Sequence, residues 1–292
     1  MTTAPALVAP VAASRRRMTL RRTAMPGLGL TLGMTMLWLG LLVLLPIVAV
    51  IIRSLGLGPA HFAEVAFSAR ALAAYRLSFG AALVAAAING VFGLLIAWVL
   101  VRYEFPSKRL VGALVDLPFA LPTAVAGIAL TAIYANTGII GHPLAALGFK
   151  VAYTPVGVVM ALIFIGLPFV VRTVEPVLAD LAKDIEEAAA TLGAGRFAIF
   201  FRVLLPEIAP ALLTGFALAF ARGVGEYGSV IFIAGNMPFV SEIAPLLIVT
   251  QLEQFDYEGA TAIAAVMLAL SFAMLVVINL IQARERTWRG SR

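Results

Sequence analysis

Continuous apolar segments, each about as long as a membrane is thick, constrain this sequence more than any other feature. A helix needs about 20 apolar residues to cross the roughly 30 Å hydrocarbon core of a bilayer, whereas a membrane β-barrel would alternate apolar and polar residues. The segments do not alternate, and 62% of the 292 residues are hydrophobic while only 12% are charged. We therefore expect an all-α polytopic membrane protein. Its six expected transmembrane helices are Gly27–Ile52, Leu77–Val101, Leu110–Tyr134, Pro155–Val171, Ile208–Ala234 and Ala260–Ile281.

The distribution of basic residues predicts the orientation. Six spans place both termini on one side of the membrane, and short cytoplasmic loops carry an excess of Lys and Arg. Sixteen of the 21 basic residues fall on the side that holds the termini. The predicted orientation is N-in and C-in, and this topology accounts for most of the formal net charge of +6 without nucleic-acid binding.

The first 26 residues are expected to form a disordered cytoplasmic tail. The first 24 residues contain five arginines and no acidic residue, which is typical of an organellar transit peptide as well as of such a tail. The apolar segment that follows is too long for a signal-peptide core. We therefore predict a retained first span.

Several kinds of chemistry have no residues to support them. The chain has no cysteine, and its two histidines, His61 and His142, fall in separate predicted external loops, so no metal site is expected. A phosphate-binding Gly-x-x-x-x-Gly-Lys-[Ser/Thr] loop is absent, as is a Gly-x-Ser-x-Gly elbow. We expect no enzyme activity and no bound cofactor, and any ATP that drives the protein must bind, with magnesium, to another subunit.

Two charges interrupt the predicted fifth span, in the sequence ARGVGEYGS. A charge at mid-bilayer costs about 2.5 to 3.5 kcal/mol, so Arg222 and Glu226, four residues apart, are expected to pair. The pair is either a structural salt bridge or part of a substrate path, together with Tyr227 and Ser229. Gly223, Gly225 and Gly228 would allow close helix approach or local unwinding.

Two prolines interrupt the predicted third span, in the sequence DLPFALPTAVAG. Pro118 and Pro122 each remove a backbone donor, so a kink or break is expected near Thr123. The break is either a packing device or a second element of the path, because irregular backbone at membrane depth needs protein or a water-filled cavity around it. Asp116 precedes the first proline, where we expect it to cap the resumed helix.

The segment between the fourth and fifth spans is polar and cytoplasmic, and it predicts two short amphipathic helices joined by a hinge. Gly193 can adopt the left-handed conformation that ends a helix. The first helix is alanine-faced, which suits a protein cleft better than a lipid surface. The first apolar stripe comprises Ile185, Ala188, Ala189 and Leu192, and the second comprises Phe197, Phe200, Phe201 and Leu204.

The spacing in this segment resembles the E-A-A-x3-G-x9-I-x-L-P loop of permease subunits of ABC importers. Glu187, Ala188 and Ala189 are followed by Gly193 and then by Val203-Leu204-Leu205-Pro206, with valine in place of the usual isoleucine. Elsewhere, the sequences DLPFALPTAVAGIAL and GEYGSVIFIAGNMP resemble the permeases of sulfate/thiosulfate importers. Molybdate permeases are similar around Arg222, so molybdate or tungstate remains an alternative substrate, and a secondary anion transporter remains an alternative class.

The resemblance implies a type I importer fold in a bacterial-type inner membrane. It implies an accessory helix and external loop in residues 27–75, a five-helix permease core in 76–282 and a cytoplasmic tail in 283–292. The implied partners are a second, related permease, two ATP-binding subunits and an external sulfate-binding protein. The implied contacts with the ATP-binding subunit are Glu187, Ala188, Ala189, Gly193, Leu205 and Pro206.

Overall fold

A computed structural model describes residues 28–181 and 183–290. The predicted tail of residues 1–26 and the last two residues lie outside the described residues. Two compact units make up the chain, Met1–Ala49 and Val50–Arg292. The division into an accessory segment, a permease core and two tails stays a prediction.

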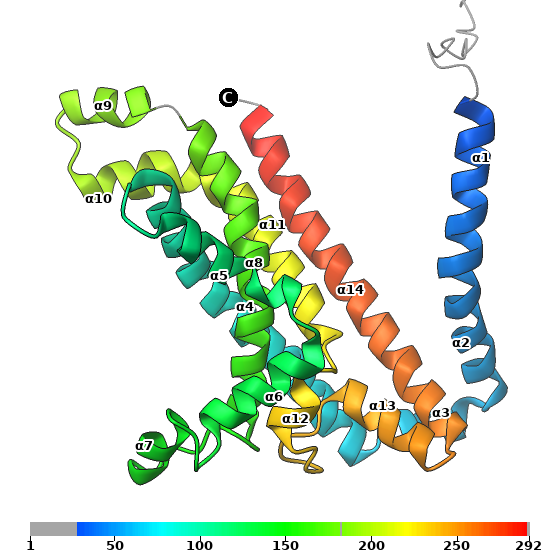
Figure 1. The fold of residues 1–292 in the computed structure, drawn as a ribbon. Helices are drawn as coiled ribbons and strands as arrows, with labels where there is room; N and C mark the ends of the chain where they lie inside the picture. Colours follow the sequence, from blue (N-terminus) through cyan, green and yellow to red (C-terminus); the bar gives the residue numbers. More distant parts are fainter. Residues whose placement is uncertain (1–27, 182, 291–292) are drawn as a thin grey trace, which may run out of the picture. The chain divides into compact units, whose positions relative to one another are not determined.

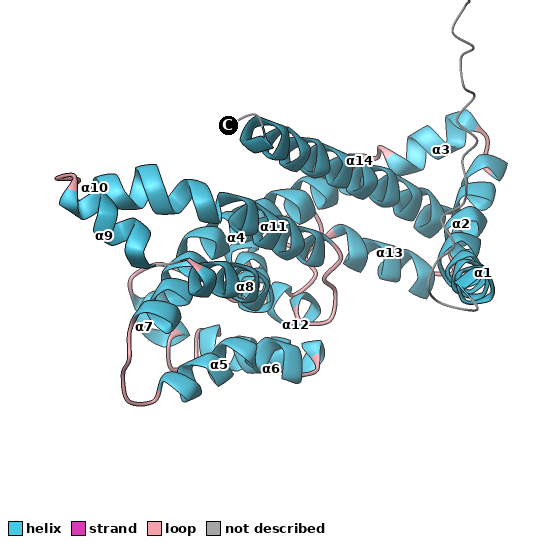
Figure 2. Ribbon diagram, turned by 90° about the horizontal axis from the view of Figure 1, so that it is seen from above, coloured by secondary structure: helices cyan, strands magenta, loops and turns pink. Residues whose placement is uncertain are grey.

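The regular elements of the described residues are helices, as Figure 2 shows. Five helices are long and apolar enough to cross a membrane, and a bent pair supplies a sixth span if it is counted as one. This confirms the expected polytopic all-α fold. The first span consists of α1 (Leu28–Leu39), the π-helical turn η1 (Gly40–Leu44) and α2 (Leu45–Gly56). The other spans contain, in chain order, α4 (Ala69–Arg102), the bent pair α5 (Lys108–Ala120) and α6 (Thr123–Tyr134), α8 (Pro155–Asp180), α11 (Leu205–Val224) and α14 (Tyr257–Gly290).

Shorter helices connect the spans. On the side opposite the predicted cytoplasm lie α3 (Pro59–Ala66), α7 (Gly141–Ala146), α12 (Val230–Ala234) and α13 (Ala244–Glu253). On the predicted cytoplasmic side lie α9 (Lys183–Thr191), α10 (Arg196–Ile199) and a second π-helical turn, η2 (Phe200–Leu204). Figure 1 shows α9 and α10 at one end of the second unit and α7, α12 and α13 at the other.

The second and fifth spans differ from their predicted limits. Helix α4 begins eight residues earlier than expected, because the Ser68 hydroxyl accepts a hydrogen bond from the Ala71 N–H and caps it. The fifth span, expected over Ile208–Ala234, ends at Val224 and is followed by an irregular segment and α12. At its other end it runs back without a break to Arg196.

The core of the second unit is formed by α4, α8 and α11, which lie side by side in Figures 1 and 2. Small residues let these helices approach closely, as is usual in membranes, where apolar burial gives little drive for association. A methyl group on Gly93 would overlap with the Val170 side chain, and one on Gly215 would press on the Val170 backbone. Buried alanines line the face of α4 that meets α8 and α11, among them Ala74, Ala81, Ala82, Ala85 and Ala86.

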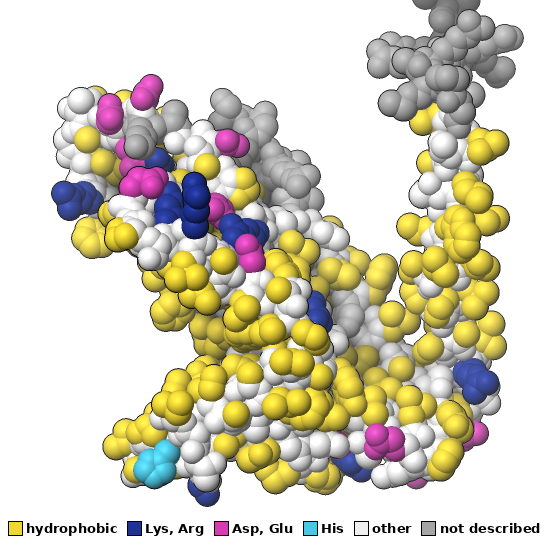
Figure 3. All heavy atoms as spheres, viewed as in Figure 1, with side chains coloured by type: hydrophobic (Ala, Val, Ile, Leu, Met, Phe, Trp, Pro, Cys, Tyr) yellow, Lys and Arg dark blue, Asp and Glu magenta, His cyan; other side chains and the backbone are white. Residues whose placement is uncertain are grey.

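The outer surface of the second unit carries the apolar side chains that a lipid-facing surface requires. On α4, these are Leu83, Val84, Val91, Phe92 and Leu95. In Figure 3 hydrophobic side chains cover the middle of this unit, whereas charged side chains gather at the end formed by α9 and α10. Charged side chains also lie at the opposite end, so the distribution is that of a membrane-embedded bundle with an apolar middle.

Candidate functional site

The breaks in the third and fifth spans meet in space. Helix α5 ends at Ala120, α6 starts at Thr123, and the two are bent by 115°. A methyl group on Gly228 would overlap with the Thr123 hydroxyl, and one on Gly127 would overlap with the Ser229 backbone. Two irregular backbone segments from different spans therefore contact each other directly, which requires glycine at both contacts.

The expected pairing of Arg222 with Glu226 is confirmed. Arg222 Nη1 lies 2.6 Å from Glu226 Oε2, and the Glu226 side chain is 1% exposed, against 37% for Arg222. Glu226 Oε1 also accepts hydrogen bonds from the Ser229 N–H and the Ser229 hydroxyl, both at 3.0 Å. The buried carboxylate thus joins the end of α11 to the start of α12.

The backbone between these helices is unwound, as the glycines allow. Helix α11 ends at Val224, residues 225–229 are not helical, and α12 begins at Val230. The carboxylate of Glu226 satisfies the N–H of Ser229, one of the donors that an interrupted helix leaves free. Tyr227 is half-buried beside it. The protein itself therefore supplies the partner that this irregular backbone needs.

The two prolines of the third span play different roles. Pro122 lies at the break, where Leu121 has an extended conformation, with ψ of 135°. Pro118 lies within α5, one turn earlier. The expectation that Asp116 caps the resumed helix is wrong, because Asp116 binds the Arg172 guanidinium of α8 through both carboxylate oxygens.

Arg172 joins α5 to α8 next to the predicted cytoplasmic end. It also donates to the Gly112 carbonyl at 3.1 Å and to Glu175 at 2.5 Å. Its signal in the sequence was that of a topological loop charge, so the contact with Asp116 could not be inferred from spacing.

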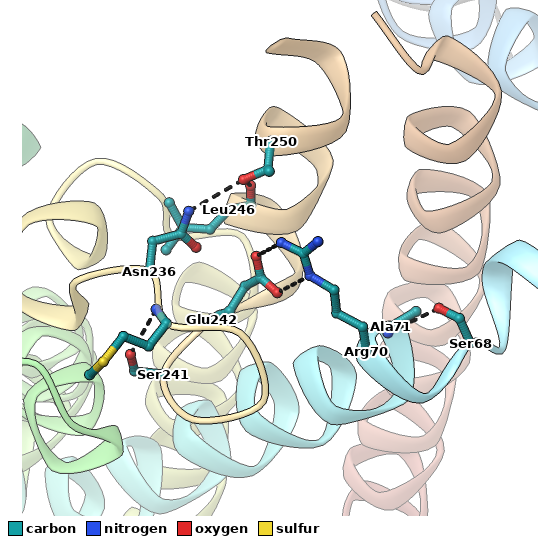
Figure 4. A network of polar contacts seen from close by, with 9 residues as sticks. Ser68, Arg70, Ala71, Asn236, Ser241, Glu242, Leu246 and Thr250 are labelled. Carbon is teal, nitrogen blue, oxygen red and sulfur yellow. Dashed lines mark hydrogen bonds and ion pairs between the residues drawn. The ribbon is translucent and has the colours of Figure 1, made fainter. Parts of the chain in front are cut away.

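On the opposite side of the membrane, a further ion pair holds the loop after α12 against α4. Arg70 donates to both carboxylate oxygens of Glu242, at 2.8 and 2.7 Å, and Glu242 is 3% exposed (Figure 4). The Ser241 hydroxyl accepts from the Met237 N–H, and the Asn236 amide donates to Thr250. Sequence reasoning missed this pair because its members are far apart in the chain.

The predicted cytoplasmic loop forms as expected up to its glycine. Helix α9 ends at Thr191, and Gly193 has a φ of +83°, in the left-handed region that favours glycine. Most side chains of the first apolar stripe are exposed rather than packed against the bundle. Ile185 in α9 is 43% exposed, and Leu192, directly after α9, is 88% exposed. Glu187 and Ala188 are exposed beside them.

The second half of the loop differs from the expected separate helix. Helix α10, η2 and α11 form one continuous helix that passes through Pro206. Pro206 has no N–H, and the preceding Leu205 N–H reaches back five residues to the Phe200 carbonyl, which makes a π-helical turn. The second stripe is divided: Phe200 and Leu204 face the bundle, whereas Phe197 and Phe201 are exposed.

A pair of charges fixes α9 to the rest of the bundle. Arg102 Nη2, at the end of α4, lies 2.5 Å from Glu186 Oε1 in α9. The contact is an ion pair rather than an aligned hydrogen bond, and both atoms are shielded from solvent. The sequence identified both residues only as charges on the cytoplasmic side and gave no sign of their contact.

The structure therefore brings five of the seven expected path residues to one region, namely Pro122 and Thr123 of the third span with Glu226, Tyr227 and Ser229 of the fifth. Arg222 lies one helical turn before them, and Pro118 lies one turn before the break in its own span. Among the described residues, no group of three or more His, Asp or Glu could hold a metal ion.

Known proteins resemble this chain in sequence and in fold. The "Probable sulfate transport system permease protein cysT" of Nephroselmis olivacea is 51% identical over 257 residues, which are 88% of this chain and 90% of that protein. The "Sulfate transport system permease protein CysT" of Escherichia coli (strain K12) is 48% identical over 263 residues, 90% of this chain and 95% of that protein. A subunit of the crystal structure of a bacterial alginate ABC transporter, in complex with a pentasaccharide-bound periplasmic protein, has a TM-score of 0.71 at 17% identity and covers 88% of this chain and 94% of that one. That likeness is one of fold.

A family model gives the assignment. The model described as "Binding-protein-dependent transport system inner membrane component" matches residues 89–287, which include both broken spans and the whole cytoplasmic loop. The chain is therefore a multi-pass inner-membrane protein that belongs to the family of binding-protein-dependent transport system inner membrane components.

Proposed function

We propose that this chain is a permease subunit of an ATP-driven importer that carries sulfate, and also thiosulfate, into the cytoplasm. The observation that carries the proposal is the identity of about half of all residues, over nearly the whole chain, with proteins named as sulfate transport permeases. The working assembly comprises a second, related permease, two ATP-binding subunits and an external binding protein. ATP and magnesium bind to the ATP-binding subunits.

The exposed face of α9 is the proposed contact with the ATP-binding subunit. Glu187, Ala188 and Ala189 present a small, partly apolar surface that fits a protein groove, and Gly193 sets the direction in which the chain leaves it. Leu205 and Pro206, at the start of α11, transmit the movement into the fifth span.

The meeting point of the two broken spans is the proposed path. Arg222 supplies a partly exposed positive charge, and the Thr123 hydroxyl and the Ser229 backbone lie at the contact between the spans. Pro118, Pro122 and Tyr227 shape the irregular backbone around them. Because Glu226 neutralises Arg222, the path offers a divalent anion a weak and transient contact, as transport requires, and the external binding protein supplies most of the selectivity.

Uptake of labelled sulfate tests the proposal directly. Cells that express this chain with its companion subunits should accumulate sulfate only when the ATP-binding subunit can hydrolyse ATP. Excess thiosulfate should compete, and excess molybdate should not. Uptake that persists without hydrolysis would exclude an ABC importer in favour of a secondary transporter, and competition by molybdate alone would replace the substrate.

A further inference from the structure

We infer that Arg102 and Trp98, one turn apart at the predicted cytoplasmic end of α4, hold both halves of the cytoplasmic loop and make α9 move together with α4. This inference rests on the proposed function, because it assigns a role in coupling ATP hydrolysis to transport. The two side chains, with Glu186 of α9 and Phe200 of η2, are called the clasp below. Its members are positioning residues.

The clasp has three contacts that follow one another. Arg102 Nη2 lies 2.5 Å from Glu186 Oε1, and the Arg102 guanidinium carbon lies 5.6 Å from the centre of the Trp98 ring. The Trp98 ring in turn meets Phe200 edge-on, at 5.8 Å between ring centres. An arginine over an indole face and an edge-on aromatic pair are both favourable at these distances.

Burial makes the clasp more than a surface ion pair. The Arg102 side chain is 11% exposed and that of Glu186 is 29% exposed, whereas exposed pairs contribute little. Among the side chains that the structure describes, this is the ion pair that joins α9 to another helix. Helix α9 also packs against α10 and η2.

Helix α4 links the clasp to the proposed path. Ala82 of α4 lies against Gly223, where an added methyl group would come within 3.3 Å of the Ala82 methyl carbon. Further along, the Ser78 hydroxyl accepts from the Ala244 N–H at 2.8 Å, and Arg70 binds Glu242. Because α4 is one continuous helix, a movement of α9 that is passed to α4 also displaces the part of α4 that lies beside the unwound segment of the fifth span.

The test uses the complete importer in proteoliposomes and measures sulfate uptake per ATP hydrolysed. Arg102→Gln and Glu186→Gln should each reduce this ratio by roughly three- to tenfold while the ATP-binding subunit still co-purifies, because the docking face of α9 is untouched. The double variant should be no worse than either single one, since both remove the same contact. Arg102→Lys should retain most of the coupling.

A matched control is available on the same side of the membrane. Glu104 and Lys108 form an ion pair at 2.8 Å between the loop after α4 and the start of α5, but Glu104 is 89% exposed and the pair joins residues only four apart in the chain. Glu104→Gln should leave the ratio unchanged. Losses that multiply in the double variant, an unchanged ratio in both single variants, or loss of the ATP-binding subunit would each overturn the clasp.

A covalent replacement separates coupling from mere stability. The chain contains no cysteine, so Arg102→Cys with Glu186→Cys can be joined by a short bifunctional thiol reagent in a cysteine-free importer. The cross-link should restore the ratio toward that of the unmodified importer, since α9 and α4 would again move together. A cross-link that fails to restore uptake, or blocks it, contradicts the proposal. An unmodified importer without ATP-dependent uptake would instead refute the proposed function.

Discussion

Among the side chains that the structure describes, Glu226 and Glu242 are almost fully buried, and each is paired with a partly exposed arginine. Glu226 is 1% exposed beside Arg222, and Glu242 is 3% exposed beside Arg70. A buried carboxylate that loses its counter-charge is costly, whereas an arginine that can reach solvent or the lipid interface is not. The two members of each pair should therefore respond differently to substitution.

Arg222→Ala should destabilise the protein more than Glu226→Gln. The first change leaves a buried charge unpaired, which costs about 3 to 5 kcal/mol, while the second leaves a partly exposed guanidinium and keeps an oxygen that can accept from Ser229. Thermal unfolding of the purified protein in detergent measures the difference. We expect assembly of Arg222→Ala to suffer as much as its transport.

The double variant Arg222→Ala with Glu226→Gln serves as the control, because it removes both charges and should be more stable than Arg222→Ala alone. If the two single variants unfold at the same temperature, the burial of Glu226 does not determine the energetics of the pair. If Arg222→Ala assembles normally and transports at the normal rate, Arg222 has no place in the path.

At the scale of elements, the turn after α9 depends on one backbone conformation. Gly193 has a φ of +83°, and no atom would lie within 4 Å of an added Cβ, so a side chain there has space but strains the backbone. Gly193→Val should cost about 1 to 2 kcal/mol in this turn and redirect α9. We expect uptake that is uncoupled from ATP hydrolysis, or an ATP-binding subunit that detaches, both measured on the purified complex.

Two other substitutions serve as controls for this prediction. Gly193→Asn should be tolerated far better, because asparagine adopts the left-handed conformation more readily than other side chains. Gly195, two residues on, has a φ of −70° and equally open surroundings, so Gly195→Ala should have little effect. Normal coupling in Gly193→Val would mean that the loop is a connector only.

The sequence predicted those features of the structure that depend on residues close together in the chain. The Arg222–Glu226 pair follows from i, i+4 spacing, the turn at Gly193 from a glycine after an apolar stripe, and the break near Pro122 from proline chemistry. What the sequence could not supply depends on residues distant in the chain. Asp116 was expected to be a cap, because its partner Arg172 comes from another helix.

The fifth span continues through Pro206, which shows a second limit of prediction from sequence. A proline normally marks a helix boundary, but here a π-helical turn precedes it, and the same arrangement occurs in the first span. In both, the residue before the proline donates to a carbonyl five residues back: Leu45 before Pro46 to Gly40, and Leu205 before Pro206 to Phe200. The shared Leu-Leu-Pro sequence is a local signal for this turn that a proline rule alone does not detect.

At the scale of the whole molecule, the clasp constrains the topology. Arg102 at the end of α4 contacts Glu186 just after the end of α8, so the two helices end on the same side of the membrane. Because both run in the same direction, the chain between them must cross back. The bent pair α5 and α6 is therefore a broken span rather than a loop that enters and leaves on one side. A re-entrant pair would leave five spans and move the four C-terminal arginines of residues 283–292 outside, against their expected cytoplasmic place.

Single cysteines placed at either end of this pair test the crossing, since the natural chain has none. Tyr103, before α5, is 57% exposed, and Ile139, after α6, is 90% exposed. A membrane-impermeant thiol reagent should label Ile139→Cys in intact cells from which the outer membrane has been removed, and Tyr103→Cys only in inside-out vesicles. Labelling of both from one side would mean that the pair is re-entrant, and would also move α9 away from the compartment in which ATP is found.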